Sequence, residues 1–252
     1  MAQPFRSLVL DQVGSTNREA FALAACGHVG PLWIMARRQT AGRGRSGRRW
    51  ASEPGNLYAS LLIELACVPA VVPQLSLLAG VATIAAIRRA AGGGPAGLRL
   101  KWPNDVLIGQ AKCAGILAES VAGQRTVAAI IGIGINLAWH PGNLGRAATH
   151  LAEHGSRVSP ETMLGHLAES MQHWLAAWNC GAEFACVRRA WLEHAGRAGE
   201  ACTVDTGTER IAGTFVDLAP DGALVIRDDK DRERVVTFGD VALASAAPQE
   251  VS

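Results

Sequence analysis

The sequence predicts an α+β fold, with a mixed, largely antiparallel sheet packed with helices and a small C-terminal β-barrel. Short alternating apolar segments typical of strands recur along the whole chain. Apolar residues at helical spacing occur near residues 16–25, 75–91 and 160–178. From about residue 199 only short strand segments and turns remain. We therefore expect a larger domain at 1–197, a small β-barrel domain at 198–246 and a tail at 247–252.

The N-terminal elements begin with a strand at 7–13, which places Leu8 and Leu10 on one face. A helix is expected to follow, because Thr16 and Glu19 have the spacing of a capping box. This helix ends near Gly27, and the apolar residues at 32–36 predict the next strand.

The central part alternates between strand and helix patterns. A strand at 56–65 precedes an Ala/Leu/Ile-rich helix at 75–91, and three glycines and a proline end that helix. A strand at 98–102 leads into a hairpin with strands at 106–108 and 113–119. The apolar run at 127–135 is long enough for a buried central strand.

The C-terminal third starts with a helix that Ser159 caps and Pro160 opens. Its predicted core stripe consists of Met163, Leu164, Leu167, Met171, Trp174, Leu175 and Trp178. Four short strands follow at 201–206, 211–218, 223–227 and 234–238. Turn residues between them indicate a barrel of about 50 residues, close to the lower limit for independent folding.

Composition excludes several classes of protein. The 252 residues are 49% hydrophobic and 18% charged, and the formal net charge is +2. Such a balance gives no global field for DNA or an anionic membrane. No apolar run nears the roughly 20 residues that span a bilayer. The six cysteines form no C-x-x-C pair, so we expect reduced thiols in the cytoplasm. The seven histidines show no metal-ligand spacing and are expected to be surface or core residues.

The segment TAGRGRSGRRW, at 40–50, has the glycine spacing of a dinucleotide-binding loop. That interpretation requires a helix directly after the glycines, whereas a Pro-Gly turn and a strand follow here. Six arginines lie between 37 and 49, but a nucleic-acid footprint usually spreads over a face. Glycines free the backbone to approach an anion, and arginine forks match phosphate, so we favour a mobile substrate lid.

Two further segments indicate ligand binding. Two of the three lysines of the chain, Lys101 and Lys112, lie in one predicted hairpin, with Asp105 at the turn between them. In IIGIGINLA, Gly132 and Gly134 weaken a buried strand, which makes sense where a ligand presses against the backbone. Asn136 then ends this strand with a polar amide.

Together these segments resemble the biotin–protein ligases. The shared motifs are GRGRSGRRW at 42–50, NLYAS at 56–60, KWPND at 101–105, KCAGIL at 112–117 and GIGIN at 132–136. Their order and spacing are specific, and the resemblance covers about residues 8–140. It implies a class II synthetase-like, biotin–lipoate ligase-like catalytic domain, with an SH3-like accessory barrel.

The resemblance also implies the reaction. The biotin carboxylate attacks the α-phosphate of ATP, giving biotinyl-5′-AMP and pyrophosphate, with Mg²⁺ as an aid. A lysine of a biotin carboxyl carrier protein or domain then attacks this anhydride. Because the sequence starts at the catalytic domain, no DNA-binding repressor role is expected. A monomer or weak homodimer is expected, and a sheet edge could serve dimerisation or acceptor docking.

The resemblance assigns a role to each matching residue. The catalytic residues would be Lys112, Arg45 and Arg48. The biotin-binding residues would be Ser15, Thr16, Asn17, Gln39, Gly42, Arg43, Lys112, Gly115, Gly132 and Gly134. The nucleotide-binding residues would be Arg43, Arg45, Arg48, Trp50, Asn104, Asp105, Lys112 and Asn136. The metal ligand would be Asp105.

Two other interpretations stay open. A lipoate or octanoate ligase-type acyltransferase is similar in fold and chemistry, but lacks the GRGRxGR loop and KWPND. A non-enzymatic ligand-binding or RNA-binding module could use the arginine loop, but it would leave the hairpin lysines and the GIGIN strand unexplained.

Overall fold

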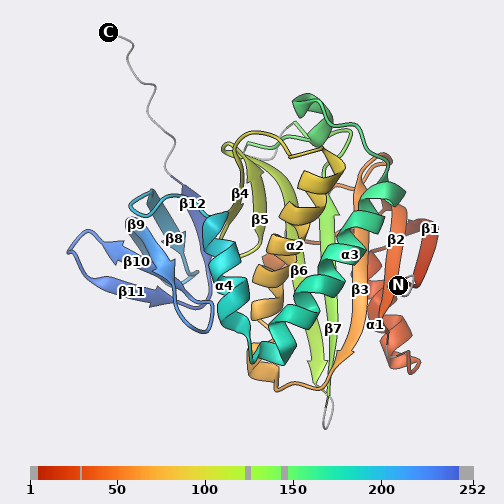
Figure 1. The fold of residues 1–252 in the computed structure, drawn as a ribbon, viewed down its shortest axis with the longest axis horizontal. Coiled ribbons are helices and arrows are strands. Elements are labelled where there is room, and N and C mark those ends of the chain that lie inside the picture. The colour runs from red at the N-terminus through yellow and green to blue at the C-terminus, as the bar shows by residue number, and fades with distance from the viewer. Residues whose placement is uncertain (1–4, 29, 123–125, 143–146, 244–252) are drawn as a thin grey trace.

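The computed structural model describes residues 5–28, 30–122, 126–142 and 147–243. The predicted tail at 247–252 lies outside these residues. A seven-stranded sheet forms the larger part of the molecule, and a five-stranded antiparallel sheet follows it (Figure 1). None of the helices in the described ranges has both the length and the hydropathy of a membrane-spanning segment.

The larger sheet has the order β1-β2-β3-β7-β6-β5-β4. Only β1 and β2 pair in parallel, and every other neighbouring pair in this sheet is antiparallel. The prediction of a mixed, largely antiparallel sheet is therefore confirmed. The strands are β1 (Ser7–Val13), β2 (Leu32–Gln39), β3 (Leu57–Leu65), β4 (Leu98–Lys101), β5 (Asp105–Ile108), β6 (Ala111–Ala122) and β7 (Val127–Ile135).

Strand β7 is central, as its apolar run predicts, and it pairs with β3 and β6. Ile131, Ile133 and Ile135 belong to the main hydrophobic core. Ile130 packs in a smaller cluster with Ala20 of the first helix. Since successive side chains alternate between faces, the glycines at 132 and 134 lie on the same face as Ile130.

The described residues form four α-helices: α1 (Thr16–Ala25), α2 (Gln74–Ala90), α3 (Pro160–Trp178) and α4 (Phe184–Glu193). The first three pack against the larger sheet, whereas α4 packs on α2, α3 and β9. Helices α2 and α3 lie side by side over one face, and α1 packs on β2, β3 and β7 (Figure 1). The predicted α3 cap is confirmed, because the Ser159 hydroxyl accepts a hydrogen bond from Thr162 N. The α3 stripe is likewise buried or packed against the core.

Some local predictions are wrong. Thr16 is the first residue of α1 rather than its cap, and its side chain bonds Gln39 instead of forming a capping box. Strand β2 extends three residues beyond 36, to Gln39. Helix α4 was not predicted, because Phe184, Val187 and Trp191 are its only buried positions and leave a short pattern.

The C-terminal sheet has the order β11-β10-β9-β8-β12. Its strands are β8 (Ala201–Asp205), β9 (Arg210–Leu218), β10 (Leu224–Asp228), β11 (Glu233–Val236) and β12 (Asp240–Leu243). Four match the predicted strands, and β12 is an addition. The predicted boundary at 197/198 falls between α4 and β8 and stays a prediction.

The small sheet shares its hydrophobic core with the larger part. Val204, Ile226 and Val241 belong to the same cluster of buried residues as α2 and β7. The buried Trp102 indole also donates a hydrogen bond to Gly222 O, at 3.1 Å. A unit this small buries little surface alone, so this shared core gives it a fixed position beside the larger sheet.

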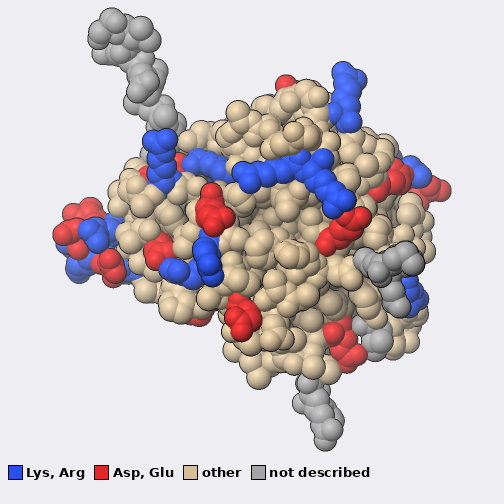
Figure 2. Space-filling view, viewed as in Figure 1, with Lys and Arg blue, Asp and Glu red and all other residues tan. Residues whose placement is uncertain are grey.

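The face seen in Figure 2 is mostly uncharged, and several of its basic side chains form a narrow row across the upper part, with acidic groups near them. Together with the net charge of +2, this arrangement offers no broad basic surface on that face. It gives no support there to the nucleic-acid-binding interpretation.

Asn56 holds the turn that follows β7. Its buried side-chain oxygen accepts hydrogen bonds from the backbone N–H groups of Leu137, Ala138 and Trp139, at 2.8, 2.9 and 3.3 Å. Its amide nitrogen donates to Trp139 O, at 2.9 Å.

We predict that Asn56→Ala lowers the free energy of unfolding by about 3 kcal/mol, because it leaves several backbone groups without partners. Urea unfolding measures this change. Gln110→Ala, which removes an exposed amide, should stay within about 0.5 kcal/mol of the parent. Equal stabilities of the two variants would show that Asn56 does not hold the turn.

Candidate active site

A cavity with an empty volume of about 600 Å³ lies on the α1 side of the larger sheet. It brings together the start of α1, the arginine loop, and strands β3, β6 and β7. Its lining residues are Ser15, Thr16, Asn17, Gln39, Arg43, Gly44, Arg45, Arg48, Arg49, Trp50, Tyr58, Ala59, Asn104, Lys112, Gly115, Ile116, Leu117, Gly132, Ile133 and Gly134. Most of the predicted site residues therefore meet in one place.

One end of this cavity is a network of buried and half-buried polar side chains. The Gln39 side-chain oxygen accepts hydrogen bonds from Thr16 N and Thr16 Oγ1, at 2.8 and 3.2 Å. Ser60 Oγ lies 2.7 Å from Thr16 Oγ1 and 2.6 Å from Asn17 Oδ1. Asn17 Nδ2 donates to Glu119, at 2.7 Å. The network holds both donors and acceptors in fixed positions beside the cavity.

The glycines of β6 and β7 keep the sheet surface low beneath the cavity. A Cβ at Gly132 would stand 2.2 Å from Asn17 Oδ1, and one at Gly134 would stand 2.6 Å from the Trp50 ring. A Cβ at Gly115 would lie 3.0 Å from the same ring. In this structure the glycines thus accommodate Asn17 and Trp50, so a ligand is not the only group that presses on the backbone here.

Lys112 and Lys101 share one buried carboxylate. Lys112 Nζ donates to Asp105 Oδ1, and Lys101 Nζ lies 3.1 Å from Asp105 Oδ2. Burial raises the pKa of the Asp105 carboxyl, but the charges of Lys112 and Lys101 outweigh it and bring the pKa below its ordinary value. The cluster keeps Asp105 ionised and fixes the Lys112 ammonium at the cavity.

Trp50 lies against this ammonium. Lys112 Nζ is 5.3 Å from the centre of the Trp50 ring, within the range of a cation–π contact. The indole N–H is buried and has no hydrogen-bond partner among the described residues. Buried donors are normally paired, so this N–H is an exception within the site.

The arginine loop is a folded-back segment. Arg43 and Arg49 form a β-bridge, and a 3-10 turn at Arg45–Gly47 reverses the chain. Ser46 and Gly47 have φ angles of 53° and 72°, which a glycine adopts at low cost. No α-helix begins directly after these glycines. The segment is therefore not a dinucleotide-binding loop, as the sequence predicts.

The C-terminal sheet supplies partners for this loop. Arg45 donates through both terminal nitrogens to Gly239 O, each at 3.2 Å, and its guanidinium lies 5.2 Å from the centre of the Phe238 ring. Arg48 bonds Asp240 Oδ1, at 2.7 Å, and Arg45 lies 3.6 Å from that atom. Burial lowers the pKa of the Arg45 guanidinium, although the charge of Asp240 opposes this shift.

Three predicted site residues do not line this cavity. Gly42 pairs with Trp50 at the base of the loop, where a Cβ would be 2.5 Å from Trp50 O. Asn136 is buried beneath Lys112, and its side chain donates to Lys112 O and Thr149 O, at 3.4 and 3.0 Å. Asp105 lines a second cavity, of about 1500 Å³ empty volume, together with Asp240. Arg48, Asn104 and Lys112 line both cavities and mark their junction.

Four contributors escaped the sequence-based assignment: Tyr58, Ser60, Glu119 and Asp240. The alternation of β3 indicates that Tyr58 and Ser60 share a face, but not that this face meets α1. Glu119 lies 3.7 Å from Arg43, on the same face of β6 as Gly115. No local pattern marks Asp240, because it is 192 positions from Arg48.

Comparison with known proteins agrees with this geometry. Residues 15–136 match the Biotin/lipoate A/B protein ligase family, and residues 198–243 match the Biotin protein ligase C terminal domain. A biotin–[acetyl-CoA-carboxylase] ligase of Paracoccus denitrificans is 40% identical over 233 residues, which cover 89% of this chain and 95% of that protein.

A second such ligase, from Mycobacterium tuberculosis, is 33% identical and covers 92% of this chain and 87% of its own length. The solved structure of the Aquifex aeolicus biotin protein ligase in complex with biotin and ATP superposes with a TM-score of 0.79 at 26% identity, covering 95% of this chain and 99% of that one. The chain therefore belongs to the biotin–protein ligase family.

Proposed function

We propose that the cavity activates biotin with ATP as biotinyl-5′-AMP, releases pyrophosphate, and then transfers biotin to a lysine of a biotin carboxyl carrier protein or domain. The observation that carries this proposal is the position of Lys112. Its ammonium lies at the junction of the two cavities, beside the arginine loop. Such a cation can neutralise a carboxylate and a phosphate that approach each other.

The polar end of the cavity suits the ureido ring of biotin. That ring carries both N–H donors and a carbonyl acceptor, and Thr16, Asn17, Ser60 and Gln39 offer complementary groups. These side chains also hold one another, so little reorganisation is needed on binding. A lipoyl chain has no ureido group to satisfy them, which favours biotin over lipoate or octanoate.

The charged end suits the triphosphate. Arg43, Arg45 and Arg48 line the first cavity beside Lys112. Both steps consist largely of positioning and charge stabilisation, so no protein nucleophile is required. The carboxylate oxygen of biotin forms a bond to the α-phosphorus, and the bond from that phosphorus to pyrophosphate breaks. The acceptor amine then forms an amide, and AMP leaves.

The contacts of Asp105 do not fit a magnesium ligand. Each of its carboxylate oxygens faces a lysine ammonium, and two adjacent cations oppose the binding of a third. Asp105 is better assigned to hold Lys112 and Lys101. Mg²⁺ would enter the site bound to the phosphates of the substrate ATP, and the proposed reaction needs no ion held by the protein itself.

The arginine loop would act as a lid that shields the anhydride from water. In the C-terminal sheet, Gly239 O binds Arg45 of this loop and Asp240 binds Arg48. We infer that this sheet helps to position the lid over the adenylate. Asn104 and Asn136 would then stabilise the backbone around the site, since their amides bond main-chain oxygens.

The surroundings of the reaction are part of the proposal. All six cysteines are free thiols, which favours the reducing cytoplasm. Strand β1 forms one edge of the larger sheet and exposes Leu8 and Val9 by 38% and 44%. This edge suits a weak homodimer or the docking of an acceptor strand, and we expect a monomer or weak dimer.

The activity is tested by measuring pyrophosphate release from MgATP by the purified chain. Release should depend on biotin and should not occur with lipoate. Release with lipoate alone would assign the chain to lipoate chemistry. No release with either acid from the folded chain would contradict an adenylating enzyme.

We predict that Lys112→Ala lowers biotin-dependent pyrophosphate release by at least about 100-fold, the usual loss when a transition-state charge partner is removed. Folding should persist, because Lys101 still neutralises Asp105. Circular dichroism checks the fold. The matched control is Lys230→Ala, which changes the remaining lysine of the chain at an exposed position. Full activity in Lys112→Ala would refute the assignment.

We predict that Arg45→Ala releases biotinyl-5′-AMP into solution several-fold faster than the parent, because the lid no longer closes. Asp240→Ala should show the same leak, since it removes the acidic partner of Arg45 and Arg48. Chromatography of free adenylate measures both. Arg227→Ala is the control, because this exposed arginine pairs with Asp231 and Glu233 within the C-terminal sheet and lines neither cavity. A leak no greater than in the control would argue against the lid.

A further inference from the structure

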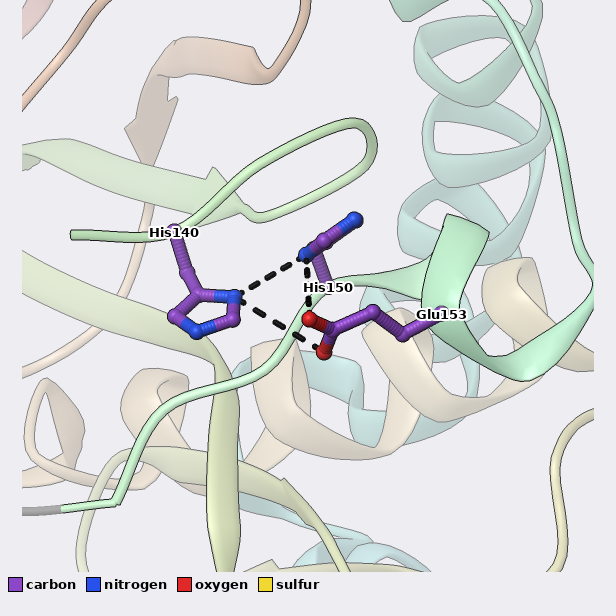
Figure 3. A group of neighbouring side chains, drawn as sticks. All are labelled: His140, His150 and Glu153. Carbon is purple, nitrogen blue, oxygen red and sulfur yellow. Dashed lines mark hydrogen bonds and ion pairs between the residues drawn. The ribbon is translucent and has the colours of Figure 1, made fainter. Parts of the chain in front are cut away.

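Outside the cavity, three side chains of metal-ligating type converge: His140, His150 and Glu153 (Figure 3). His140 lies in the segment after β7, His150 precedes a 3-10 helix at Leu151–His154, and Glu153 lies within that helix. One ligand atom from each falls within 4.8 Å of the others. Neither the spacing of the histidines nor any motif indicated this meeting, because His140 and His150 are ten positions apart.

The distances have the scale of a coordination polyhedron. His140 Nδ1 and His150 Nδ1 are 2.9 Å apart. Glu153 Oε2 lies 3.8 Å from His140 Nδ1, and Glu153 Oε1 lies 3.5 Å from His150 Nδ1. A tetrahedral ion bound at about 2.0–2.1 Å separates its ligand atoms by about 3.3 Å. Small rotations of these side chains would therefore bring three ligand atoms around one ion.

The surroundings hold the ligands in place. The Thr149 hydroxyl donates to Glu153 Oε2, at 2.6 Å, and also lies 2.8 Å from His154 Nε2. Such outer contacts orient a liganding carboxylate. The side chains of His140 and His150 are only 22% and 16% exposed, whereas that of Glu153 is 45% exposed. The two imidazoles of the cluster are thus largely buried, whereas its carboxylate is open to water.

We propose that His140, His150 and Glu153 form a binding site for a divalent transition cation of the zinc class, with water completing the coordination. Two imidazoles and one carboxylate suit zinc and its neighbours, whereas Mg²⁺ and Ca²⁺ prefer oxygen ligands. The three side chains line neither cavity of the proposed reaction, and the proposal does not depend on the proposed function.

The position of the site gives the cation a structural role. Leu151 N and Ala152 N donate to the backbone oxygens of Asn136 and Leu137, so the 3-10 helix already packs on the segment after β7. An ion bridging His140 to His150 and Glu153 would cross-link these two segments. Thr149 N also bonds Lys112 O, at 3.0 Å, so the cross-link would steady the backbone beside Lys112.

The test uses the full chain after treatment with a chelator and removal of that chelator. Isothermal titration with Zn²⁺ should show one site, and each of His140→Ala, His150→Ala and Glu153→Gln should weaken binding by at least about 10–100-fold. His28→Ala, at an exposed position outside the cluster, is the matched control and should bind like the parent. Melting temperatures without metal establish that each variant is folded.

Co²⁺ provides a second readout, because its visible spectrum reports coordination geometry and its near-ultraviolet bands report thiolate ligands. We expect a four- or five-coordinate spectrum without thiolate bands in the parent, and its loss in the three variants. Excess Zn²⁺ should raise the melting temperature of the parent and of His28→Ala only. No binding by the parent, binding unchanged in the variants, or a thiolate spectrum would overturn the proposal and leave the cluster as a hydrogen-bonded group.

Discussion

The buried carboxylate of Asp105 is the interaction on which the site depends. It forms ion pairs with both Lys101 of β4 and Lys112 of β6, whose ammonium groups lie in largely buried positions. Charges this far from water are tolerated only when they are paired and hydrogen-bonded. Lys101 also donates to Val241 O of the C-terminal sheet, at 2.9 Å. One carboxylate therefore fixes the cation of the cavity and links it to the second sheet.

The two faces of the larger sheet have different roles. Strand β7 buries isoleucines on the face covered by α2 and α3, and presents glycines on the other face. Glycine normally weakens a strand, but here β7 pairs along its full length with β3 and β6, which compensates the loss. The low surface leaves room for Asn17 and Trp50, and the cavity lies above it. Packing on one face thus supports binding on the other.

Charge balance explains the order of the arginine loop. Four arginines in seven positions repel one another, yet Glu119 and Asp240 place negative charge beside three of them. Those acids come from β6 and β12, on two different sheets. The loop is consequently shaped by both parts of the molecule, and the C-terminal sheet is tied to the site through salt bridges and a shared core.

The sequence by itself determined the fold class, the order of nearly all strands and helices, and most of the residues that line the cavity. Periodicity reports which face of an element is apolar, and short motifs mark backbone that must turn or lie flat; both are local properties. The tertiary structure alone decided the partners: Asp240 for Arg48, Glu119 for Asn17, and His140 for His150 and Glu153. It also placed Asp105 and Asn136 as supports beside the cavity. Contacts between distant residues depend on how whole elements pack, and no local pattern encodes that packing.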